Sequence, residues 1–559
     1  MKILIIGGVA GGSSTAARLR RLNEKAEIII FEREKNISVA SCGIPYFCGE
    51  VIKERSELEI MTPLKFEKML NVEIRTQSNV LKINRNEKTI LIKDLQTGRE
   101  YKENYDKLVL SPGAHPHKPD IMGIDNDKIF TIRTLEDADK VKAQIALKVT
   151  KVAVIGAGYI GLEMAENLSH LGLDVTIIQR PAQVLNSSDP EIACQLQNRL
   201  EENGIKVIVN NSAQSFENSS DKNKLRINLK DNTLLDVNFA VLVIGVRPEN
   251  TLAKEAGLKI GETGGILVNE NLQTSDKNIY ALGDAIEVTD LVSQEAVLIP
   301  LAGPANRQGR IVAENICGIN SKYKVTQGTS IIKLFNFTVG ITGNNEKQLK
   351  KYGIKYLKAY AHSFSHATYY PGAAPLTIKL LFAPENGKIL GAQATGVDGV
   401  DKRIDVIATI IKMNGTVRDL VDLELSYAPQ VGSAKDPINI VGMVAENILK
   451  NFVKSVYWDE IDSLPQDTFV LDVRADEDFQ KVSGSFTNTT RIPLEQLRSR
   501  LNELPKNKPI LVYCAKGLKS YFASRLLIQN GFNNILNLNG GYLITKQINQ
   551  IKSQEGIFV

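Results

Sequence analysis

The sequence contains few cysteines and no long apolar run, and these two absences exclude several classes of protein. Its five cysteines are an odd number without regular spacing, which is not the pattern of an extracellular disulfide framework or of a zinc cluster. No apolar run reaches the roughly 18 residues that a membrane-spanning helix needs, and the first residues indicate a strand rather than a secretory leader. We therefore expect a cytoplasmic protein without a membrane segment, in which any cysteine chemistry is catalytic.

A strong net charge is also missing. The chain carries 68 Lys and Arg against 63 Asp and Glu, a formal charge of +5, so nucleic acid is not an expected partner. Its 559 residues, 43% of them hydrophobic, are more than one hydrophobic core usually organises. The sequence therefore predicts a globular protein of several domains.

A strand, a glycine turn, a helix and a second strand follow one another twice, at 3–34 and at 151–180. This order is typical of a βαβ nucleotide-binding half, in which the pyrophosphate meets backbone N–H groups at the helix N-terminus. Glycine turns also serve plain strand-to-helix packing, which is the alternative interpretation of each copy taken alone. Because the unit is repeated, we expect an α/β protein with two Rossmann-like dinucleotide-binding domains.

The two glycine turns are not identical. The second contains all three glycines of the motif, which are Gly156, Gly158 and Gly161. The first keeps Gly7 and Gly12 but has Val9 at the middle position, which narrows the approach of a phosphate to the backbone. Glu32 follows Gly12 by 20 residues, where a carboxylate accepts a hydrogen bond from a ribose. The first turn therefore also predicts a dinucleotide site.

A third segment, "TSDKNIYALGDA" at 274–285, indicates which nucleotide the first unit binds. It predicts a strand that ends in Gly283 and Asp284, and it resembles the second FAD signature of flavoproteins with two dinucleotide-binding domains. The resemblance implies FAD on the first unit, NAD(P)H on the second, and Asp284 on the ribityl chain of the flavin. It also implies that Arg33 and Gly113 belong to the cofactor site. The alternative is a solvated aspartate after a strand.

The second unit leaves the choice between NADH and NADPH open. Its second strand ends in Gln179 and Arg180, so the carboxylate that usually binds the ribose of NADH is absent. Arg180 either pairs with the 2′-phosphate of NADPH or is a solvated residue at a strand end. We place both residues in the cofactor site and expect use of both nicotinamides.

The resemblance extends beyond the cofactor sites. The stretches "SCGIPYFCGEVI", "PLAGPANRQGRIVAENI", "YYPGA" and "LSYAPQVGSAKDPIN" are similar to the single-cysteine branch of the disulfide reductase family, over about residues 1 to 450. Members of that branch are coenzyme A disulfide reductases, coenzyme A persulfide reductases, and NADH oxidases or peroxidases. The resemblance implies that Cys42 is the redox-active nucleophile beside the flavin.

Cys48 is the other cysteine of this stretch. Dithiol relatives have four residues between their two cysteines, whereas five residues and Pro45 separate Cys42 from Cys48. Proline disfavours the regular helical turn that an internal disulfide would need there. We therefore interpret Cys48 as a small buried hydrophobe, with a resolving thiol as the alternative. For Cys42 we expect the partial positive charge of a helix N-terminus to lower the pKa.

The resemblance implies a relay in which NAD(P)H reduces the flavin, the flavin reduces oxidised Cys42, and the thiolate attacks an external disulfide or persulfide. A group must protonate the departing thiolate, and no histidine lies near "LSYAPQ". Tyr427 in that segment and Tyr369 in "YYPGA" match tyrosines that line the active site of the coenzyme A branch, and a phenol can donate a proton. Interface packing is the alternative for Tyr369. Peroxide and oxygen reducers of the branch carry a histidine where this chain has Ala10, which disfavours a dedicated peroxidase.

The family's coenzyme A contacts transfer to this chain by motif. They imply seven residues, which are Ser14, Arg18, Arg21, Ser38, Ser41, Asn306 and Lys435. Cations are needed to meet the phosphates of coenzyme A, and the first helix supplies them. A solvated basic helix face is the alternative, and for Arg20 it is the better one.

The last hundred residues have an α/β pattern of their own. The stretches "TFVLDVR", "PILVYCAKGLKSYFASRLLIQNGF" and "ILNLNGG" resemble a rhodanese domain. Cys514 follows a buried-type strand and precedes a helix, so backbone N–H groups can surround a cysteine persulfide, and Lys516 and Lys519 add positive charge. Inactive or phosphatase-like relatives are the alternative.

The expected organisation has five segments. These are a first FAD-binding part (1–115), an NAD(P)H-binding domain (116–245), a second FAD-binding part (246–322), an α+β dimerisation domain (323–450) and a rhodanese α/β domain (451–559).

We expect a homodimeric reductase of coenzyme A disulfide and persulfides, with FAD and NADH or NADPH as cofactors and coenzyme A as a bound ligand or substrate moiety. No metal site is expected. The alternatives are an NADH oxidase or peroxidase of the same family, and a persulfide carrier or redox sensor.

Overall fold

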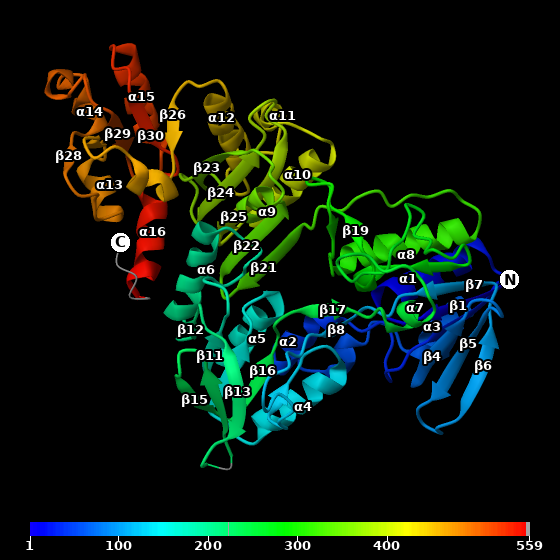
Figure 1. Ribbon diagram of the computed structural model, residues 1–559. Helices are drawn as coiled ribbons and strands as arrows, with labels where there is room; N and C mark the ends of the chain where they lie inside the picture. Colours follow the sequence, from blue (N-terminus) through cyan, green and yellow to red (C-terminus); the bar gives the residue numbers. More distant parts are fainter. Residues whose placement is uncertain (222, 555–559) are drawn as a thin grey trace. The chain divides into compact units, whose positions relative to one another are not determined.

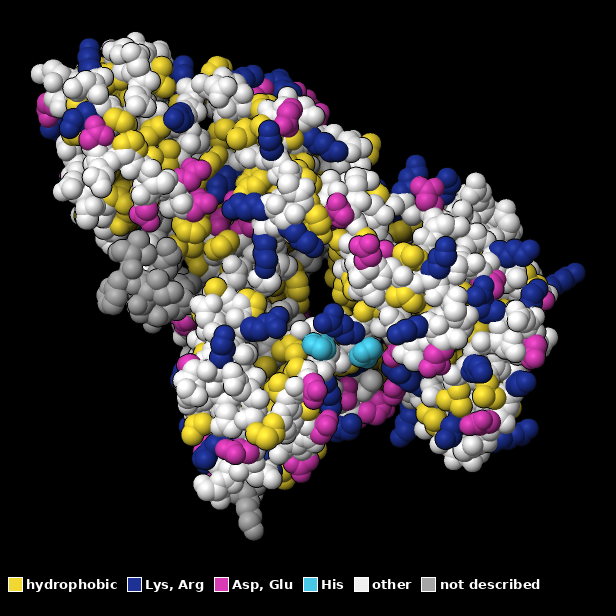
Figure 2. All heavy atoms as spheres, viewed as in Figure 1, with side chains coloured by type: hydrophobic (Ala, Val, Ile, Leu, Met, Phe, Trp, Pro, Cys, Tyr) yellow, Lys and Arg dark blue, Asp and Glu magenta, His cyan; other side chains and the backbone are white. Residues whose placement is uncertain are grey.

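The computed structural model describes residues 1–221 and 223–554. The chain forms two compact units (Figure 1). Unit 1 contains Met1–Ala182 and Asn203–Gly328, and unit 2 contains Gln183–Glu202 and the chain from Thr329 onward. In the part of the chain that the structure describes, no helix is both long enough and apolar enough to cross a membrane. On the face shown in Figure 2, acidic side chains are interspersed with the basic ones.

The first dinucleotide-binding part of unit 1 is built on a parallel sheet with the order β18-β7-β1-β2-β3. Its strands are β1 (Lys2–Ile6), β2 (Glu27–Phe31), β3 (Glu73–Arg75), β7 (Lys107–Leu110) and β18 (Ile279–Ala281). The continuous apolar runs of β1 and β2 suit a sheet that is covered on both faces. Helix α1 (Ala10–Leu22) packs closely against α8 (Ala302–Ile316). This approach requires Gly309, because a Cβ there would lie 2.7 Å from the Gly11 carbonyl oxygen.

Shorter elements complete this part. They are η1 (Ser41–Gly43), α2 (Ile44–Cys48), η2 (Arg55–Leu58), α3 (Pro63–Leu70), α7 (Thr251–Glu255), η3 (Gly283–Ala285), and the strands β19 (Val288–Thr289) and β20 (Ala296–Val297). An antiparallel sheet is formed by β4 (Ser78–Asn84), β5 (Thr89–Asp94) and β6 (Glu100–Asn104).

The second dinucleotide-binding part of unit 1 repeats the parallel design with the order β12-β11-β10-β16-β9. The strands are β9 (Ile129–Phe130), β10 (Lys151–Ile155), β11 (Asp174–Ile178), β12 (Lys206–Ile208) and β16 (Phe239–Leu242), and the helices are α4 (Leu135–Ala146) and α5 (Tyr159–His170). An antiparallel sheet of β13 (Ala213–Asn218), β14 (Leu225–Leu229) and β15 (Leu234–Val237) follows. The two chain segments that connect the dinucleotide-binding parts, β8 (Ala114–Pro116) and β17 (Val246–Pro248), pair with each other.

Unit 2 begins with an antiparallel sheet in the order β21-β22-β25-β24-β23. Its strands are β21 (Ser330–Leu334), β22 (Phe337–Gly343), β23 (Leu357–Phe364), β24 (Pro375–Phe382) and β25 (Ile389–Gly396). The accompanying helices are α6 (Pro190–Glu202), α9 (Glu346–Lys351), α10 (Val400–Lys412), α11 (Val417–Asp422) and α12 (Pro437–Leu449). Helix α6 lies within the range 116–245 that the sequence assigns to nucleotide binding, yet it contacts β22 and β25.

The C-terminal part of unit 2 is a separate parallel sheet with the order β26-β30-β29-β27-β28. The strands are β26 (Lys454–Val456), β27 (Phe469–Asp472), β28 (Thr489–Arg491), β29 (Ile510–Tyr513) and β30 (Ile535–Leu538). The helices are η4 (Trp458–Ser463), α13 (Asp476–Lys481), α14 (Leu494–Leu497), η5 (Leu501–Glu503), α15 (Leu518–Gln529) and α16 (Gly541–Gln554). Two Rossmann-like parts, an α+β part and an α/β part confirm the predicted fold class.

Candidate active site

The first glycine turn joins β1 to α1 and has the geometry of a nucleotide cradle. Gly7 has φ +95°, and a Cβ there would lie 2.1 Å from the Ser111 carbonyl oxygen. A Cβ at Gly12 would lie 1.8 Å from the Gly7 carbonyl oxygen. Glu32 follows the end of β2, and its buried carboxylate accepts a hydrogen bond of 2.8 Å from the Gly8 N–H. Glycine is therefore required at both positions, and the predicted carboxylate lies against the turn.

Asp284 lies in η3, directly after β18. Because β1, β7 and β18 are parallel neighbours, their C-terminal ends bring Asp284 and the glycine turn to one edge of the sheet. The pKa of Asp284 is raised, because the effect of burial exceeds the lowering by Arg133. Arg133 Nη1 lies 3.7 Å from Asp284 Oδ2. Gly113 has φ +74°, and a Cβ there would lie 2.5 Å from Arg133 Nη2. Sequence reasoning missed Arg133, since no motif marks it. Arg33 is exposed beside Glu249.

This edge fits FAD. The turn offers backbone N–H groups, and a side chain at Gly7 or Gly12 would collide with the chain there. The half-buried carboxylate of Asp284 lies two strands away in the sheet. These are the donor and acceptor types that a pyrophosphate and a ribityl chain need.

The second glycine turn repeats this arrangement with one change of chemistry. Gly156 has φ +109°, and a Cβ at Gly161 would lie 2.0 Å from the Gly156 carbonyl oxygen, while Gly158 faces open space at the start of α5. Gln179 Oε1 accepts a hydrogen bond of 2.9 Å from the Ala157 N–H, as Glu32 does from Gly8 in the first turn. An amide therefore replaces the carboxylate. The neighbouring Arg180 is exposed.

Cys42 is an exposed free thiol in η1, just before α2. Partial desolvation by the surrounding chain raises its pKa, and the negative charges of Glu163 and Asp284 raise it further, against a smaller lowering by its own backbone N–H. The expected lowering of the Cys42 pKa by a helix N-terminus is therefore wrong for the chain itself. Helix α2 has only five residues, and Cys42 lies before it rather than at its first turn.

Cys48 is fully buried at the end of α2 and carries a free thiol. Burial raises its pKa to about 12, so it is a poor nucleophile at neutral pH. The structure therefore presents one accessible thiol in this stretch, and Cys48 fills space in the core.

The residues predicted to hold coenzyme A within unit 1 lie on two helices and the loop before Cys42. Ser14 on α1 donates a hydrogen bond of 2.7 Å to Asn306 Oδ1 on α8, which brings two of the predicted contacts together. Arg18 is 2.7 Å from Glu314, and its Nε is buried without a partner. Arg21 and Ser41 are exposed. Ser38 is half-buried with φ 51°, and its N–H donates to the Gly8 carbonyl.

Arg20 is not the solvated residue that the sequence predicts. It is 6% exposed, and its guanidinium donates to the carbonyl oxygens of Asn23, Glu24, Leu70 and Asn71. These bonds bind the end of α1 to the end of α3, so Arg20 is structural.

Two predicted tyrosines of unit 2 contact each other. The hydroxyls of Tyr369 and Tyr427 are 2.5 Å apart, although the residues are 58 positions apart in the sequence. Both rings are exposed, and the hydrogen bond with Tyr427 raises the pKa of Tyr369. Lys435 is also exposed. Such an exposed aromatic pair is typical of a surface that a ligand or another subunit covers.

Cys514 follows β29 and is buried to 3% exposure. The Gly517 N–H donates to Cys514 Sγ over 3.1 Å, and the thiol donates to Ser520 Oγ at 3.5 Å. Gly517 has φ +97°, which turns the loop into α15. The N–H of Tyr542 donates to the Cys514 carbonyl and fixes the loop to α16. The Gly517 N–H thus offers a backbone donor to a sulfur anion at this position.

The two lysines of this loop have different surroundings. Lys516 Nζ is 4.9 Å from the centre of the Phe364 ring, and burial lowers its pKa. Lys519 is 2.8 Å from Asp478 and 3.3 Å from Glu495, and the hydrogen bond to Asp478 raises its pKa. The charge of Lys519 is therefore neutralised within the chain, which leaves Lys516 as the loop's cation for an anionic sulfur.

Alternate residues of β23 connect the two parts of unit 2. Lys358 pairs with Asp459 at 2.9 Å, the Tyr360 N–H donates to Asn539 Oδ1, and Phe364 contacts Lys516. His362 Nε2 is 2.9 Å from the Gly540 carbonyl oxygen and Nδ1 is 2.9 Å from Thr377 Oγ1, which fits a neutral ring that donates from Nε2. Burial lowers the pKa of His362 to about 4. Sequence reasoning missed this surface, although residues 358, 360, 362 and 364 alternate as one face of a strand does.

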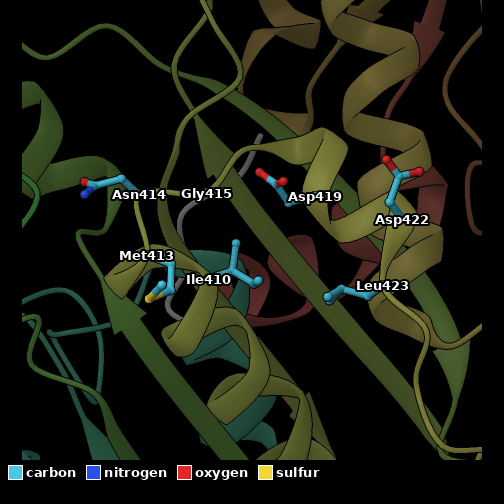
Figure 3. Close-up of a pocket in the computed structure, with 7 residues that line it drawn as sticks. All are labelled: Ile410, Met413, Asn414, Gly415, Asp419, Asp422 and Leu423. Carbon is cyan, nitrogen blue, oxygen red and sulfur yellow. The ribbon is translucent and has the colours of Figure 1, made fainter.

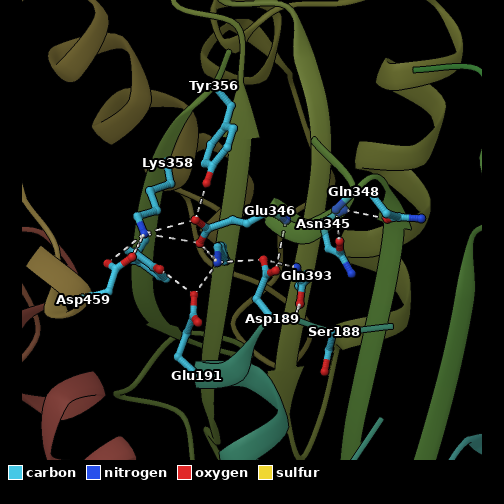
Figure 4. A network of polar contacts seen from close by, with 12 residues as sticks. Ser188, Asp189, Glu191, Asn345, Glu346, Gln348, Tyr356, Lys358, Gln393 and Asp459 are labelled. Atoms are coloured by element: carbon cyan, nitrogen blue, oxygen red, sulfur yellow. Dashed lines mark hydrogen bonds and ion pairs between the residues drawn. The ribbon is translucent and has the colours of Figure 1, made fainter. Parts of the chain in front are cut away.

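The contact that β23 makes within unit 2 continues in a buried ionic cluster (Figure 4). Lys379 Nζ is 2.7 Å from Asp189 and also contacts Glu191 and Glu346. Burial lowers the pKa of Lys379, but the three carboxylates outweigh it and raise that pKa. The three acids are spaced as metal ligands, and the lysine ammonium contacts all of them. The cluster thus binds α6 and α9 to the sheet through the chain's own cation.

Removal of that cation will destabilise unit 2. In Lys379→Met, the buried carboxylates of Asp189 and Glu191 lose their counter-charge, while Glu346 keeps Lys358 at 3.3 Å. We expect the free energy of unfolding to fall by about 3–5 kcal/mol. Lys350→Met is the matched control, because Lys350 approaches the same Glu346 but is 65% exposed, so it will change stability by no more than about 1 kcal/mol. Urea unfolding of both variants measures this. Equal midpoints for the two would contradict the role of Lys379.

A cavity of about 400 Å³ lies at the end of α10 (Figure 3). It is lined by Ile410, Met413, Asn414, Gly415, Asp419, Asp422 and Leu423. The Asp419 carboxylate accepts hydrogen bonds from the backbone N–H and hydroxyl of Thr416, and Asp422 pairs with Arg418. None of the predicted site residues lines this cavity.

Comparison with known families matches this architecture segment by segment. Residues 1–309 match "Pyridine nucleotide-disulphide oxidoreductase", residues 329–436 match the dimerisation domain of the same family, and residues 455–543 match "Rhodanese-like domain". The chain belongs to the pyridine nucleotide-disulphide oxidoreductase family. The resemblance inferred from the cysteine stretch and the glycine turns is thus confirmed.

Similar proteins and structures agree with this membership. The chain is 36% identical to an NADH oxidase of Methanocaldococcus jannaschii over 80% of this chain and 99% of that protein. It is 34% identical to the coenzyme A disulfide reductase of Staphylococcus epidermidis, over 80% of this chain and 100% of that protein. The structure of reduced Bacillus anthracis CoADR-RHD superposes with a TM-score of 0.95 at 46% identity, over 98% of each chain. An NAD-dependent persulfide reductase from A. fulgidus gives 0.91 at 35% identity, over 97% of this chain and 100% of that one.

Proposed function

We propose that this protein reduces coenzyme A disulfide and coenzyme A or related persulfides with NAD(P)H. The observation that carries the proposal is a single accessible thiol, Cys42, beside a dinucleotide edge, in a chain that also contains a rhodanese-like domain. The similarity to CoADR-RHD and to a persulfide reductase spans nearly the whole chain, including the C-terminal domain. The reaction belongs in the cytoplasm, where NAD(P)H is available.

The chain's residues divide the binding of cofactors between the two turns. Gly7, Gly12, Glu32 and Asp284 hold FAD, with Gly113 and Arg33 at its edge, and the second turn holds NAD(P)H. FAD held by these residues would supply two-electron transfer between NAD(P)H and sulfur.

Cys42 acts as the nucleophile. Its thiolate attacks one sulfur of R–S–S–R, or the carbon-bound sulfur of R–S–SH, which forms Cys42–S–S–R and breaks the S–S bond of the substrate. The departing RS⁻ or HS⁻ needs a proton. The paired hydroxyls of Tyr369 and Tyr427 supply a phenolic donor, because the hydroxyl that accepts within the pair keeps its own proton free to donate.

Coenzyme A is recognised by the polar residues around this thiol. Ser14 and Asn306 already form one hydrogen-bonded pair, and Arg21 is exposed for a phosphate. Arg18, Ser38, Ser41 and Lys435 complete the proposed set.

The protein acts as a homodimer in this proposal. Tyr369, Tyr427 and Lys435 are exposed in unit 2, within or next to the dimerisation-domain match, and they serve the Cys42 site of the partner subunit. The rhodanese-like domain carries sulfane sulfur on Cys514, which Lys516 and the loop N–H groups stabilise.

We propose that the second turn accepts both NADH and NADPH. In Arg180→Ala the KM for NADPH will rise by about 5- to 10-fold, because the 2′-phosphate loses a cation, while the KM for NADH stays within about twofold. Gln179→Glu keeps the acceptor for the Ala157 N–H but adds a negative charge, so it will select against NADPH. Steady-state kinetics with both nicotinamides measures this. Equal changes in KM for NADH and NADPH would show that Gln179 and Arg180 do not determine the choice of nicotinamide.

An NADH oxidase is the second candidate, favoured by the 36% identity to a protein of that name. The first turn has Ala10 rather than a histidine, so no imidazole is present there to assist cleavage of an O–O bond. Turnover with coenzyme A persulfide, coenzyme A disulfide, glutathione persulfide and peroxide decides between the two. The proposal requires faster NAD(P)H oxidation with the sulfur substrates, and equal or faster turnover with peroxide would overturn it.

A further inference from the structure

Glu163 lies on α5 of the second dinucleotide-binding part and contacts the short helix that follows Cys42. Helix α2 packs against α5, and Tyr46 Oη donates a hydrogen bond of 3.4 Å to Glu163 Oε1. Gly49 permits this approach, because a Cβ there would lie 2.5 Å from the Asn167 side chain. Both helices belong to unit 1, so the pair is part of the environment of Cys42.

The electrostatic surroundings of Glu163 make its charge variable near neutral pH. Burial raises its pKa to about 7, the neighbouring Glu166 also raises it, and the hydrogen bond from Tyr46 lowers it. The other acid that faces Cys42, Asp284, has the cation Arg133 at 3.7 Å. Glu163 has only a neutral phenol as its hydrogen-bond donor in α2.

The charge of Glu163 raises the pKa of Cys42. After desolvation, Glu163 is the largest cause that raises the pKa of Cys42, followed by Asp284. An ionised Glu163 therefore opposes the thiolate, and a protonated Glu163 does not.

We propose that Glu163, held by Tyr46, is a positioning residue that controls when Cys42 ionises. Glu163 takes up a proton from solvent when the Cys42 sulfur becomes anionic and returns it when Cys42 is again in a disulfide. Two-electron reduction of a Cys42–S–S–R bond leaves two sulfur anions, with the electrons drawn from NAD(P)H. Protonation of Glu163 removes the repulsion on one of them. This inference rests on the proposed function, because it assigns Cys42 as the reacting thiol.

The test is the rate at which iodoacetamide alkylates Cys42 in the reduced holoenzyme, followed by mass spectrometry of the Cys42 peptide. Glu163→Gln will react about 3- to 10-fold faster than wild type near pH 8 and at the same rate near pH 6, because only the ionised carboxylate repels the thiolate. Glu163→Asp keeps the charge and will retain the wild-type pH dependence.

Tyr46→Phe separates this role from a structural one. It removes the hydrogen bond that lowers the pKa of Glu163, so Glu163 stays protonated to higher pH. The variant will therefore resemble Glu163→Gln near pH 7.5 and approach wild type above about pH 9. A packing defect alone would change the alkylation rate of Cys42 by a similar factor at every pH.

Glu50→Gln is the matched control, because Glu50 follows the same helix but is exposed and pairs with Lys142. It will leave the alkylation profile unchanged. The inference is overturned if the profiles of Glu163→Gln and wild type superimpose. Turnover of Cys42→Ser tests the proposed function separately: an inactive Cys42→Ser together with an unchanged Glu163→Gln profile removes this inference alone.

Discussion

Replacing Cys42 by serine will abolish reductase turnover, with kcat at least about a thousandfold lower, while the protein keeps its FAD. A serine hydroxyl neither ionises near neutral pH nor forms a mixed disulfide, so no electrons reach the substrate sulfur. The glycine turn, Glu32 and Asp284 are untouched by the change. Absorption near 450 nm reports the bound flavin, and NAD(P)H oxidation with coenzyme A disulfide reports turnover.

Cys48→Ser is the matched control for this experiment. Cys48 is fully buried with a pKa of about 12, so serine there costs some stability but leaves the redox thiol in place. We expect turnover within about threefold of wild type in this folded variant. Residual turnover in Cys42→Ser, or an equal loss in both variants, would contradict a single redox cysteine.

Replacing Cys514 by serine will separate the two activities of the chain. Transfer of sulfur from thiosulfate or polysulfide to an acceptor thiol will fall by at least about a hundredfold, because no persulfide forms on serine. Reduction of soluble coenzyme A persulfide will stay within about twofold, because Cys514 and Cys42 belong to different compact units. Sulfide release and NAD(P)H oxidation are measured side by side.

Cys317→Ser provides the control for general effects of thiol loss, since Cys317 is half-buried in unit 1 and has no predicted role. It will change neither activity by more than about twofold. If Cys514→Ser lost both activities equally, the account of two separable modules would be wrong.

Much of the site was predictable because its residues act through local backbone geometry. A glycine with φ +95° or +109° is required at Gly7 and Gly156 for steric reasons, and the spacing from there to Glu32 and Gln179 follows from one helix and one strand. The same holds for Cys514, whose loop lies between β29 and α15. Local rules of this kind leave a pattern in the sequence.

Contacts between distant segments left no such pattern. Arg133 contacts Asp284 across 151 positions, and Lys379 contacts Asp189, just before α6, and Glu191 on α6. In the sequence, each of these residues taken alone is indistinguishable from an ordinary charged residue at the surface. Only the fold shows that these charges lie together, half-buried at Asp284 and fully buried at Lys379.

The two incorrect predictions share a physical cause. Arg20 and the Cys42 thiol were both assigned from the local helix alone, as a solvated helix face and as a thiol at a helix N-terminus. In the structure, the carbonyl groups of Leu70 and Asn71 at the end of α3 accept hydrogen bonds from Arg20. At Cys42, desolvation, followed by the carboxylates of Glu163 and Asp284, outweighs the local backbone effect on the pKa. Neighbours from other elements determined both environments.

The most direct test of the central claim is mass spectrometry of the protein after oxidation with coenzyme A disulfide, without reduction before digestion. The account predicts that the Cys42 peptide carries coenzyme A in a mixed disulfide and that Cys48 is a free thiol. A peptide pair in which Cys42 is bonded to Cys48 would contradict it.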